Sequence, residues 1–311
     1  MFASYCSRVL EIRDATDPAG LATSAELHNA ILPHRAITAE EVGEMASYSL
    51  HWARVLALRD GQPVGTGAGE IVPTLADKAW LILEVLPGAR RAGAGTALLD
   101  HLRGWARDHG AAHVEVSVEE DDPESVAFAE RRGFTEIGRE SRLVLELDGF
   151  EPPPVDLPAG IDQIATLAER PELIRGLYEV ALEASPDIPG EEDDPVSPFD
   201  QWVREELGGL GDRPDAIFVA LAGDEVAGYS KFHVPLARPD ELMHDLTGVK
   251  RAWRGRGVAG ALKRAQLHWA KGRGVRRLVT MNEVRNEPIR RLNERLGYQL
   301  APGKVHMRAP A

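Results

Sequence analysis

The chain has 311 residues, 43% hydrophobic and 27% charged, which is enough for two globular domains with cores of their own. Its net charge of −13 argues against nucleic-acid binding, and no apolar run approaches the roughly 20 residues of a membrane span. Cys6 is the only cysteine, which excludes an internal disulfide and a cysteine zinc cluster, so we expect a soluble cytoplasmic protein without a metal.

The first half of the chain alternates between strand and helix signals. Thr38 followed by Glu41 is a capping box, and Asp122 before Pro123 opens a short helix. In chain order these signals predict a strand at 9–13, helices at 18–31 and 39–47, strands at 53–58, 64–72 and 79–86, a helix at 94–109, a strand at 113–118, the short helix, and two final strands that include 141–147.

Three consecutive prolines, Pro152 to Pro154, predict an extended linker, and therefore domains of 1–150 and 155–311. The second half then repeats the order of the first. It is predicted to contain helices at 171–183 and 198–207, strands at 216–221, 226–234 and 242–249, a helix at 258–271, a strand at 277–281 and a helix at 287–296. This alternation predicts a mixed α/β (α+β) fold in each half.

Residues of the first half recur in the second half at a constant offset of 164 positions, without a gap. Two tryptophans and several glycines in one register indicate a duplication rather than chance. The matched residues Arg90, Gly93, Leu98, Trp105, Gly110, Arg131 and Gly133 recur as Arg254, Gly257, Leu262, Trp269, Gly274, Arg295 and Gly297.

A glycine-rich turn follows the fourth predicted strand of each half and precedes a long helix. The two turns read Arg90-Arg91-Ala92-Gly93-Ala94-Gly95, followed by Thr96, and Arg254-Gly255-Arg256-Gly257-Val258-Ala259. Such glycines let successive N–H groups point into one concavity at a helix N-terminus, which predicts a pyrophosphate cradle. An ordinary strand-to-helix turn is the alternative.

Two other phosphate sites are disfavoured by the position and composition of these turns. A dinucleotide-binding turn follows the first strand of its unit, and a Walker loop requires a Gly-Lys-Ser/Thr sequence. The segment from Lys250 to the C-terminus has 16 Lys or Arg and 3 Asp or Glu, about +13, which suits either an anionic ligand or a solvated basic face.

The turns resemble motif A of the GCN5-related N-acetyltransferase (GNAT) family, [Gln/Arg]-x-x-Gly-x-[Gly/Ala] after a splayed fourth strand. The segment from Asn286 to Tyr298 is similar to the family's second motif. The resemblance covers both halves and implies tandem domains whose partly antiparallel sheets, flanked by helices, open between the fourth and fifth strands. It implies acetyl-CoA as acyl donor, held by the turn residues, with its pantetheine arm in the opening near Val249 and Val85. Asn286 would contact the arm, or only cap its helix.

In this family a carboxylate or histidine on the fourth strand commonly deprotonates the acceptor amine. Asp245 lies four residues before Val249, and the two-residue period of a strand puts both on one face, so Asp245 is the candidate catalytic base. A polar residue facing solvent is the alternative. The same count from Val85 reaches Leu81, so the first domain is predicted to be a scaffold or a non-catalytic acetyl-CoA site.

Two more positions distinguish this sequence from common family members. Asp122 stands where the second half has Asn286, which weakens the second motif of the first half. Ala129 and Asn293 stand where a tyrosine is usually the general acid, so the proton for the leaving thiolate is left to Tyr298, to water or to no side chain. The tandem architecture is similar to that of mycothiol synthases, whose C-terminal domain is the active one.

Acidic residues 191–194 precede the second hairpin, where this family binds its acceptor. They form either a field that attracts a cationic amine or a solvated flexible loop. The predicted function is transfer of an acetyl group from acetyl-CoA to a primary amine of a small cationic molecule, with no nucleic-acid or membrane partner. A non-enzymatic acyl-CoA-binding regulatory or scaffold protein is the alternative, and both a monomer and a dimer are left open.

Overall fold

The computed structural model describes residues 9–189 and 194–311. Cys6 and three acidic loop residues, Glu191, Glu192 and Asp193, therefore lie outside the described residues. The chain forms two compact units: the first comprises 1–117, 127–136 and 307–311, and the second comprises 118–126 and 137–306.

The first unit carries the elements that the sequence predicts, with ends that differ by a few residues. The helix expected at 39–47 is shorter, because Met45–Ser47 is a separate 3₁₀ turn. In chain order the elements are β1 (Leu10–Asp14), α1 (Pro18–Ile31), α2 (Ala39–Glu44), β2 (His51–Arg59), β3 (Gln62–Ile71), β4 (Lys78–Val85), α3 (Ala94–Asp108), β5 (His113–Glu119) and α4 (Pro123–Glu130). The strands are hydrogen-bonded in the order β1-β2-β3-β4-β5, followed by the end of the last strand of the chain, β12 (Gln299–Pro310).

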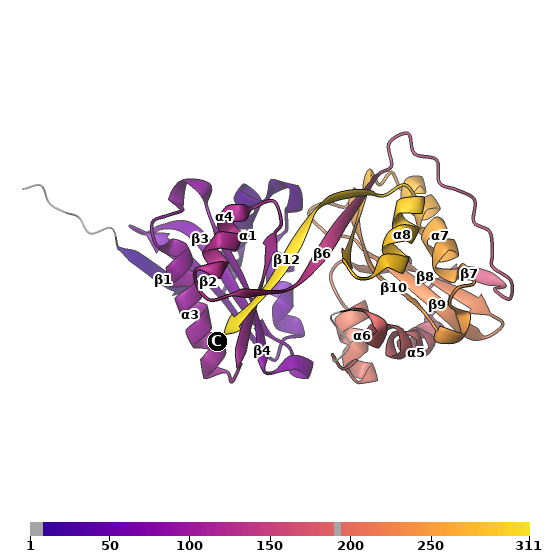
Figure 1. Cartoon of the computed structure of the whole chain (residues 1–311), viewed down its shortest axis with the longest axis horizontal. Coiled ribbons are helices and arrows are strands. Elements are labelled where there is room, and N and C mark those ends of the chain that lie inside the picture. The colour runs from indigo at the N-terminus through magenta and orange to yellow at the C-terminus, as the bar shows by residue number, and fades with distance from the viewer. Residues whose placement is uncertain (1–8, 190–193) are drawn as a thin grey trace, which may run out of the picture. The chain divides into compact units, whose positions relative to one another are not determined.

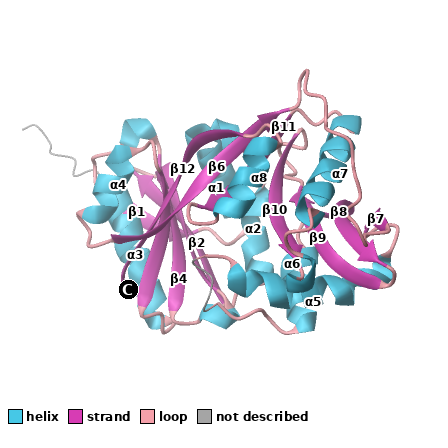
Figure 2. Cartoon of the chain, turned by 45° about the vertical axis from the view of Figure 1, so that its right-hand side comes forward, coloured by secondary structure: helices cyan, strands magenta, loops and turns pink. Residues whose placement is uncertain are grey.

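The second unit repeats this plan, with strand order β6-β11-β10-β9-β8-β7. Its elements are β6 (Thr135–Glu146), β7 (Gln163–Thr166), α5 (Ile174–Ala184), α6 (Phe199–Leu207), β8 (Asp212–Ala222), β9 (Glu225–His233), β10 (Glu241–Val249), α7 (Val258–Gly272), β11 (Arg277–Glu283), α8 (Glu287–Arg295) and β12 (Gln299–Pro310). The mixed α/β fold in two copies is therefore confirmed. Figure 2 shows β8, β9 and β10 side by side.

The strands β6 and β12 cross from one unit to the other. The prediction of two final strands in the first half is wrong, because this half ends in one strand of 12 residues, β6, and the second half likewise ends in one, β12. β6 pairs antiparallel with β11 in the second unit, whereas the end of the chain joins the first unit, where the Ala311 N–H donates to the Ala112 carbonyl (3.0 Å). A single cut between 150 and 155 therefore does not separate the compact units.

Helices cover both faces of the sheet in the second unit (Figure 1). α5 and α6 bury Leu177 and Trp202 against one face, and α7 buries Leu267 beside Leu296, which follows α8, against the other face. Neighbouring residues on β9 and β10 consequently face different pairs of helices.

Both sheets open between their fourth and fifth strands, as the resemblance implied. In the second unit β10 and β11 pair in parallel only from Glu241 opposite Arg277 to His244 opposite Thr280. In the first unit β4 and β5 pair only over the three residues Lys78–Trp80. The remaining part of each fourth strand is paired on one side only, which leaves room for an extended ligand along its free edge.

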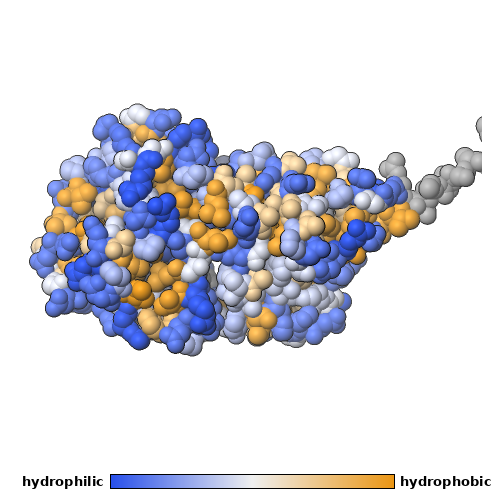
Figure 3. Space-filling view, turned by 180° about the vertical axis from the view of Figure 1, so that it is seen from behind, coloured by the Kyte–Doolittle hydropathy of each residue, from blue (hydrophilic) through white to orange (hydrophobic). Residues whose placement is uncertain are grey.

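Hydrophilic side chains cover most of the face shown in Figure 3, with apolar side chains in small groups between them. Among the described residues, no helix has the length and apolarity that crossing a membrane requires.

Candidate active site

The glycine-rich turn of the second unit has the backbone geometry of an anion cradle. Gly255 and Gly257 adopt φ values of 72° and 92°, in the left-handed region that favours glycine. Gly257 is the N-cap of α7, and the first helical hydrogen bond runs from the Ala261 N–H to the Gly257 carbonyl (3.0 Å). The N–H groups of residues 258–260 precede that bond, so the helix does not use them and they can bind phosphate oxygens.

The turn of the first unit has nearly the same backbone, with Arg91 at φ 61° and Gly93 at φ 92°. The first hydrogen bond of α3 again starts after the turn, from the Ala97 N–H to the Gly93 carbonyl (3.0 Å). Two side-chain features differ: Thr96 accepts a hydrogen bond from Arg132, and a Cβ at Gly95 would lie 3.3 Å from the Phe128 ring. The backbone of the turn is thus present twice, and Arg132 and Phe128 lie against the first copy.

The arginine that opens each turn ties the turn to the preceding strand. Arg254 Nε donates to the Val249 carbonyl (3.0 Å) and Arg90 Nε donates to the Val85 carbonyl (3.3 Å). Arg254 also binds Asp187, and hydrogen bonds from Arg251 and Arg254 lower the pKa of Asp187 to about 2. Arg256, in the middle of the second turn, lies over Trp253, with its Cζ 5.0 Å from the ring centroid. The arginines that open the two turns therefore hold each turn in place.

A β-bulge interrupts β10 at the point where the sheet opens. His244 pairs with Phe232 and Thr247 with Ser230, so Asp245 and Leu246 together oppose Lys231 alone. The bulge leaves backbone groups unpaired beside the opening. It also shifts the alternation of side chains along the strand.

The shift changes the face on which Asp245 lies. Val249 packs with the apolar cluster beneath α7, whereas Leu246 packs with the α5 and α6 cluster. Asp245 points to the α6 side and pairs with Lys231, as described below. The expectation that Asp245 and Val249 share one face is wrong, because the extra residue of the bulge breaks the two-residue period.

Lys231 lies at the centre of a charged cluster, which we call the Lys231 cluster and which consists of Lys231, Asp245, Glu206 and Asp212. The Lys231 side chain is 3% exposed, and its Nζ lies 2.9 Å from Asp245 Oδ2, 3.3 Å from Glu206 Oε2 and 3.4 Å from Asp212 Oδ1. It also donates to the Glu206 backbone carbonyl (2.6 Å). Burial opposes the charged form, but the three carboxylates outweigh it and raise the pKa of Lys231.

The carboxylates outnumber the lysine, so the Lys231 cluster has an excess of negative charge. The side chains of Asp245 and Glu206 are 48% and 36% exposed, so a ligand can reach both. Burial and the charges of Asp245 and Asp212 raise the pKa of Glu206, against the opposite effect of Lys231. The Tyr229 hydroxyl, buried near Glu206 and Asp245, has no hydrogen-bond partner within the described part of the chain.

Sequence reasoning missed Lys231, Glu206 and Tyr229. A lysine in the middle of the mostly apolar strand 226–234 was the signal that could have found the Lys231 cluster, because a buried charge requires partners. Glu206 has no such signal, since it follows another glutamate on the polar part of a helix.

The first unit has no equivalent of the Lys231 cluster among its described residues. Its β3 and β4 pair without a register shift from Gly65 opposite Val85 to Glu70 opposite Trp80. Gly65 corresponds in this register to Gly228, which pairs with Val249, and Lys231 therefore corresponds to Ala68. Leu81, opposite Gly69, is buried.

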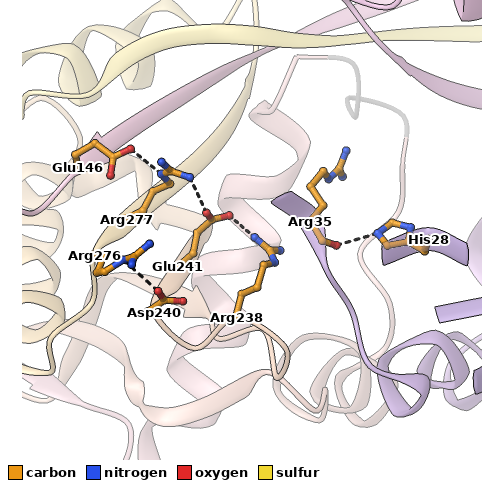
Figure 4. Close-up of polar contacts among 8 residues, drawn as sticks. All are labelled: His28, Arg35, Glu146, Arg238, Asp240, Glu241, Arg276 and Arg277. Atoms are coloured by element: carbon orange, nitrogen blue, oxygen red, sulfur yellow. Dashed lines mark hydrogen bonds and ion pairs between the residues drawn. The ribbon is translucent and has the colours of Figure 1, made fainter. Parts of the chain in front are cut away.

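The polar group on β4 of the first unit is Glu84, which the sequence reasoning did not consider. Its carboxylate lies 2.8 Å from His28 Nδ1, and His28 Nε2 lies 2.8 Å from the Arg35 carbonyl (Figure 4). Glu84 is therefore already bound by α1, on which His28 lies.

Polar side chains on the α7 and α8 side of the sheet are too deeply buried to meet an acceptor. Asn293, at the usual position of the acid, is buried and donates to Asn282 Oδ1 (2.9 Å). The Tyr298 hydroxyl is bonded to His244 Nε2, and burial raises the pKa of Tyr298. Burial and the nearby charge of Lys263 lower the pKa of His244.

The two residues that open the helix after the fifth strand behave differently. Asp122 caps α4, accepting from the Ser125 N–H (3.0 Å) and from its hydroxyl (2.7 Å). Asn286 is the N-cap of α8, yet within the described part of the chain its side chain makes no capping hydrogen bond. The Asn286 amide is thus available to a ligand in a way that the Asp122 carboxylate is not.

Glu241, the other carboxylate of β10, is bound by Arg238 and by Arg277, whose guanidinium also reaches Glu146 (Figure 4). This leaves Asp245 as the carboxylate of β10 that lies at the opening. Among the described residues, no group of three or more His, Cys, Asp or Glu is arranged to hold a metal ion.

In each unit the mixed sheet splays after its fourth strand, and a turn with the backbone geometry of an anion cradle follows that strand. The sequence pattern of the acetyltransferase (GNAT) family matches residues 25–134 and 174–298, more than half of the chain, and the chain belongs to this family. The family inferred from the two motifs is confirmed. The chain is thus an N-acetyltransferase with two GNAT regions.

Several known proteins are similar to this chain over most of its length. A mycothiol acetyltransferase of Geodermatophilus obscurus is 26% identical over 92% of both chains, and one of Catenulispora acidiphila is 29% identical over 69% of this chain and 67% of its own length. The tandem GNAT protein from the clavulanic acid biosynthesis pathway superposes with a TM-score of 0.78 at 21% identity, covering 97% of this chain and 98% of its own. A GCN5-related N-acetyltransferase from Sphaerobacter thermophilus gives a TM-score of 0.75 at 24% identity, with 97% and 95% covered.

Proposed function

We propose that this enzyme transfers an acetyl group from acetyl-CoA to a primary amine of a small cationic molecule, by direct attack in a ternary complex, and that the second unit carries out the reaction. The observation that carries the proposal is the Lys231 cluster. It lies at a bulge beside the open edge of β10, and the first unit has neither the bulge in β4 nor the cluster among its described residues.

Acetyl-CoA fits the residues present. The N–H groups of residues 258–260 would bind its pyrophosphate, and the turn from Gly255 to Ala259 leaves room for it, since no heavy atom lies within 4 Å of a Cβ built at Gly255. The open edge of β10 near Val249 would pair with the pantetheine arm, and the uncommitted amide of Asn286 would bind it from α8. Acetyl-CoA supplies the activated acyl group.

Asp245 is the proposed catalytic base. An alkylammonium such as that of lysine has a pKa of about 10.4 and is protonated at neutral pH, so it must lose a proton before it can attack. The half-exposed Asp245 carboxylate attracts the cation and accepts its proton, directly or through water. With Asn293 bonded to Asn282, we assign protonation of the leaving thiolate to water.

The first unit is proposed to be a scaffold or a passive acetyl-CoA site. Its cradle, from Arg90 to Thr96, repeats the backbone of the second turn. Its fourth strand, however, presents Leu81 where a base is needed, and Glu84 is bound by His28.

Two relatives are named mycothiol acetyltransferase, so a mycothiol-type acceptor is the first to test, followed by amino sugars and polyamines. We also propose a cytoplasmic setting, since a chain with one cysteine cannot form an internal disulfide.

The test is incubation of the protein with acetyl-CoA and a panel of such amines, with thiol release and the acetylated product both measured. We expect turnover with at least one cationic amine. Binding of acetyl-CoA without transfer to any amine would contradict the proposal.

A further inference from the structure

Three carboxylates surround Lys231, and a tyrosine lies near two of them, whereas the proposed mechanism uses only Asp245. Glu206 comes from α6, Asp212 from β8 and Asp245 from β10. Because Glu206 Oε2 and Asp245 Oδ2 lie 3.3 Å and 2.9 Å from the same Lys231 Nζ, these two oxygens are at most about 6 Å apart, close enough for one ammonium group to lie between them.

The four members of the Lys231 cluster have different tasks. Asp212 is buried, with a side chain only 5% exposed, and its Oδ2 accepts from the Gly209 N–H (2.9 Å), so it is part of the framework. Asp245 Oδ2 pairs with Lys231 across the bulge. Glu206 is one-third exposed and held in place by Lys231, which binds both its carboxylate and its backbone carbonyl.

Glu206 also lies where a carboxylate holds a proton readily. It is the penultimate residue of α6, at the end of the helix dipole that disfavours negative charge. The charged groups that face it are Lys231 of β9, Asp245 of β10 and Asp212 of β8, and burial together with the two aspartates raises its pKa despite Lys231. General bases work best when their pKa approaches the working pH.

The buried hydroxyl of Tyr229 is a second, independent sign that a polar group binds here. It lies close enough to Glu206 and Asp245 for their charges to act on it, and within the described part of the chain it has no hydrogen-bond partner. A buried hydroxyl without a partner is costly, so a bound water or a ligand amine is expected beside it.

We propose that Glu206 is a second catalytic carboxylate, on which the proton released by the acceptor ammonium comes to rest, while Lys231 positions it. This inference rests on the proposed function. The ammonium gives its proton to Asp245, and the proton passes on through water to Glu206, which becomes neutral. The free amine nitrogen forms a bond to the thioester carbon and the carbon–sulfur bond breaks. The second proton of the former amine passes through water to the departing thiolate, which leaves a neutral amide and free CoA, and Glu206 returns its proton to solvent.

The test compares Glu206→Gln with Glu205→Gln, a matched control on the same helix whose carboxylate contacts Gln201 rather than Lys231. Each variant is assayed from pH 5 to 9 with acetyl-CoA and the best cationic amine of the panel. We expect Glu206→Gln to lower kcat/KM by about 10²-fold or more and to abolish the acid limb of the pH profile. Glu205→Gln should keep the rate and the limb.

Two further measurements separate proton transfer from simple disruption. Methoxyamine is unprotonated at neutral pH, so the loss in Glu206→Gln should shrink at least tenfold with this acceptor, while acetyl-CoA affinity stays at the wild-type value. Lys231→Met removes the cation that opposes protonation of Glu206, so the acid limb should move to higher pH.

A Glu206→Gln variant with a near-normal rate and an unchanged acid limb would overturn the role of Glu206 while leaving the proposed function intact. An equal loss with methoxyamine and with the cationic amine would also overturn it. A wild-type protein that acetylates no amine of the panel would refute the proposed function, and the role of Glu206 with it.

Discussion

Replacing Gly257 with valine tests the anion cradle at the start of α7. A Cβ at this position would meet only Pro158 Cγ at 3.9 Å, so the variant has no steric reason to unfold. Its backbone, at φ 92°, is nevertheless one that a β-branched residue avoids. The left-handed conformation costs an L-residue roughly 1–2 kcal/mol, and the free variant escapes that cost by rotating its N–H groups out of the cradle.

Binding must then restore the strained turn, so acetyl-CoA affinity should fall by at least the same free energy. At 1.4 kcal/mol for each factor of ten, this is about 5- to 30-fold. Calorimetric titration with acetyl-CoA measures the effect, and Gly272→Val serves as control, because Gly272 ends the same helix with free space around it and an ordinary φ. Unchanged affinity in a Gly257→Val, Gly93→Val double variant would show that the turns are not the phosphate site.

Three further predictions concern single residues. Gly93→Val should leave most of the acetyl-transfer rate intact, and a loss as large as that of Gly257→Val would move the chemistry to the first unit. Asp245→Asn should lower kcat/KM at least tenfold and leave the affinity for acetyl-CoA unchanged. Because the substitution removes a charge that raises the pKa of Glu206, the acid limb of the pH profile should move to lower pH. Near-normal rates from pH 6 to 9 would exclude Asp245 as the base. Burial lowers the pKa of Lys263 from 10.5 to about 7. Between these two values Lys263 is protonated in the unfolded chain and neutral in the folded one, so the free energy of unfolding should rise from pH 7.5 to 9.5. Denaturant titrations of the wild type should show this rise, and a rise of equal size in Lys263→Met would assign it to another group.

The exchange of β6 and β12 affects how the protein can be divided. β6 is encoded before the linker but pairs with β11 of the second unit, and the last residues of the chain belong to the first unit. Each unit thus takes part of its sheet from the other half of the sequence. The linker at Pro152–Pro154 lies between the two GNAT regions, 25–134 and 174–298, but inside the second compact unit.

The amino-acid sequence alone determined the features that depend on local spacing. The offset of 164 positions, the glycines before each long helix and the alternation of strands and helices are all short-range patterns, and they were enough to predict two GNAT regions. Gly257 could be identified from the sequence because few residues other than glycine adopt the left-handed conformation that this turn requires before the helix. The position of Asp245 on β10 was likewise correct, although its face was not.

The tertiary structure alone decided the partners of these residues. A bulge cannot be counted from the strand that contains it, because the extra residue is defined only by the register of the neighbouring strand, in which Lys231 stands opposite both Asp245 and Leu246. Glu206 reaches the same lysine from a helix 25 residues earlier in the chain. The sequence around a carboxylate on a helix does not show which charges will surround it. Burial raises the pKa of Glu206, and charged groups on β8, β9 and β10, which only folding brings together, raise it further or lower it.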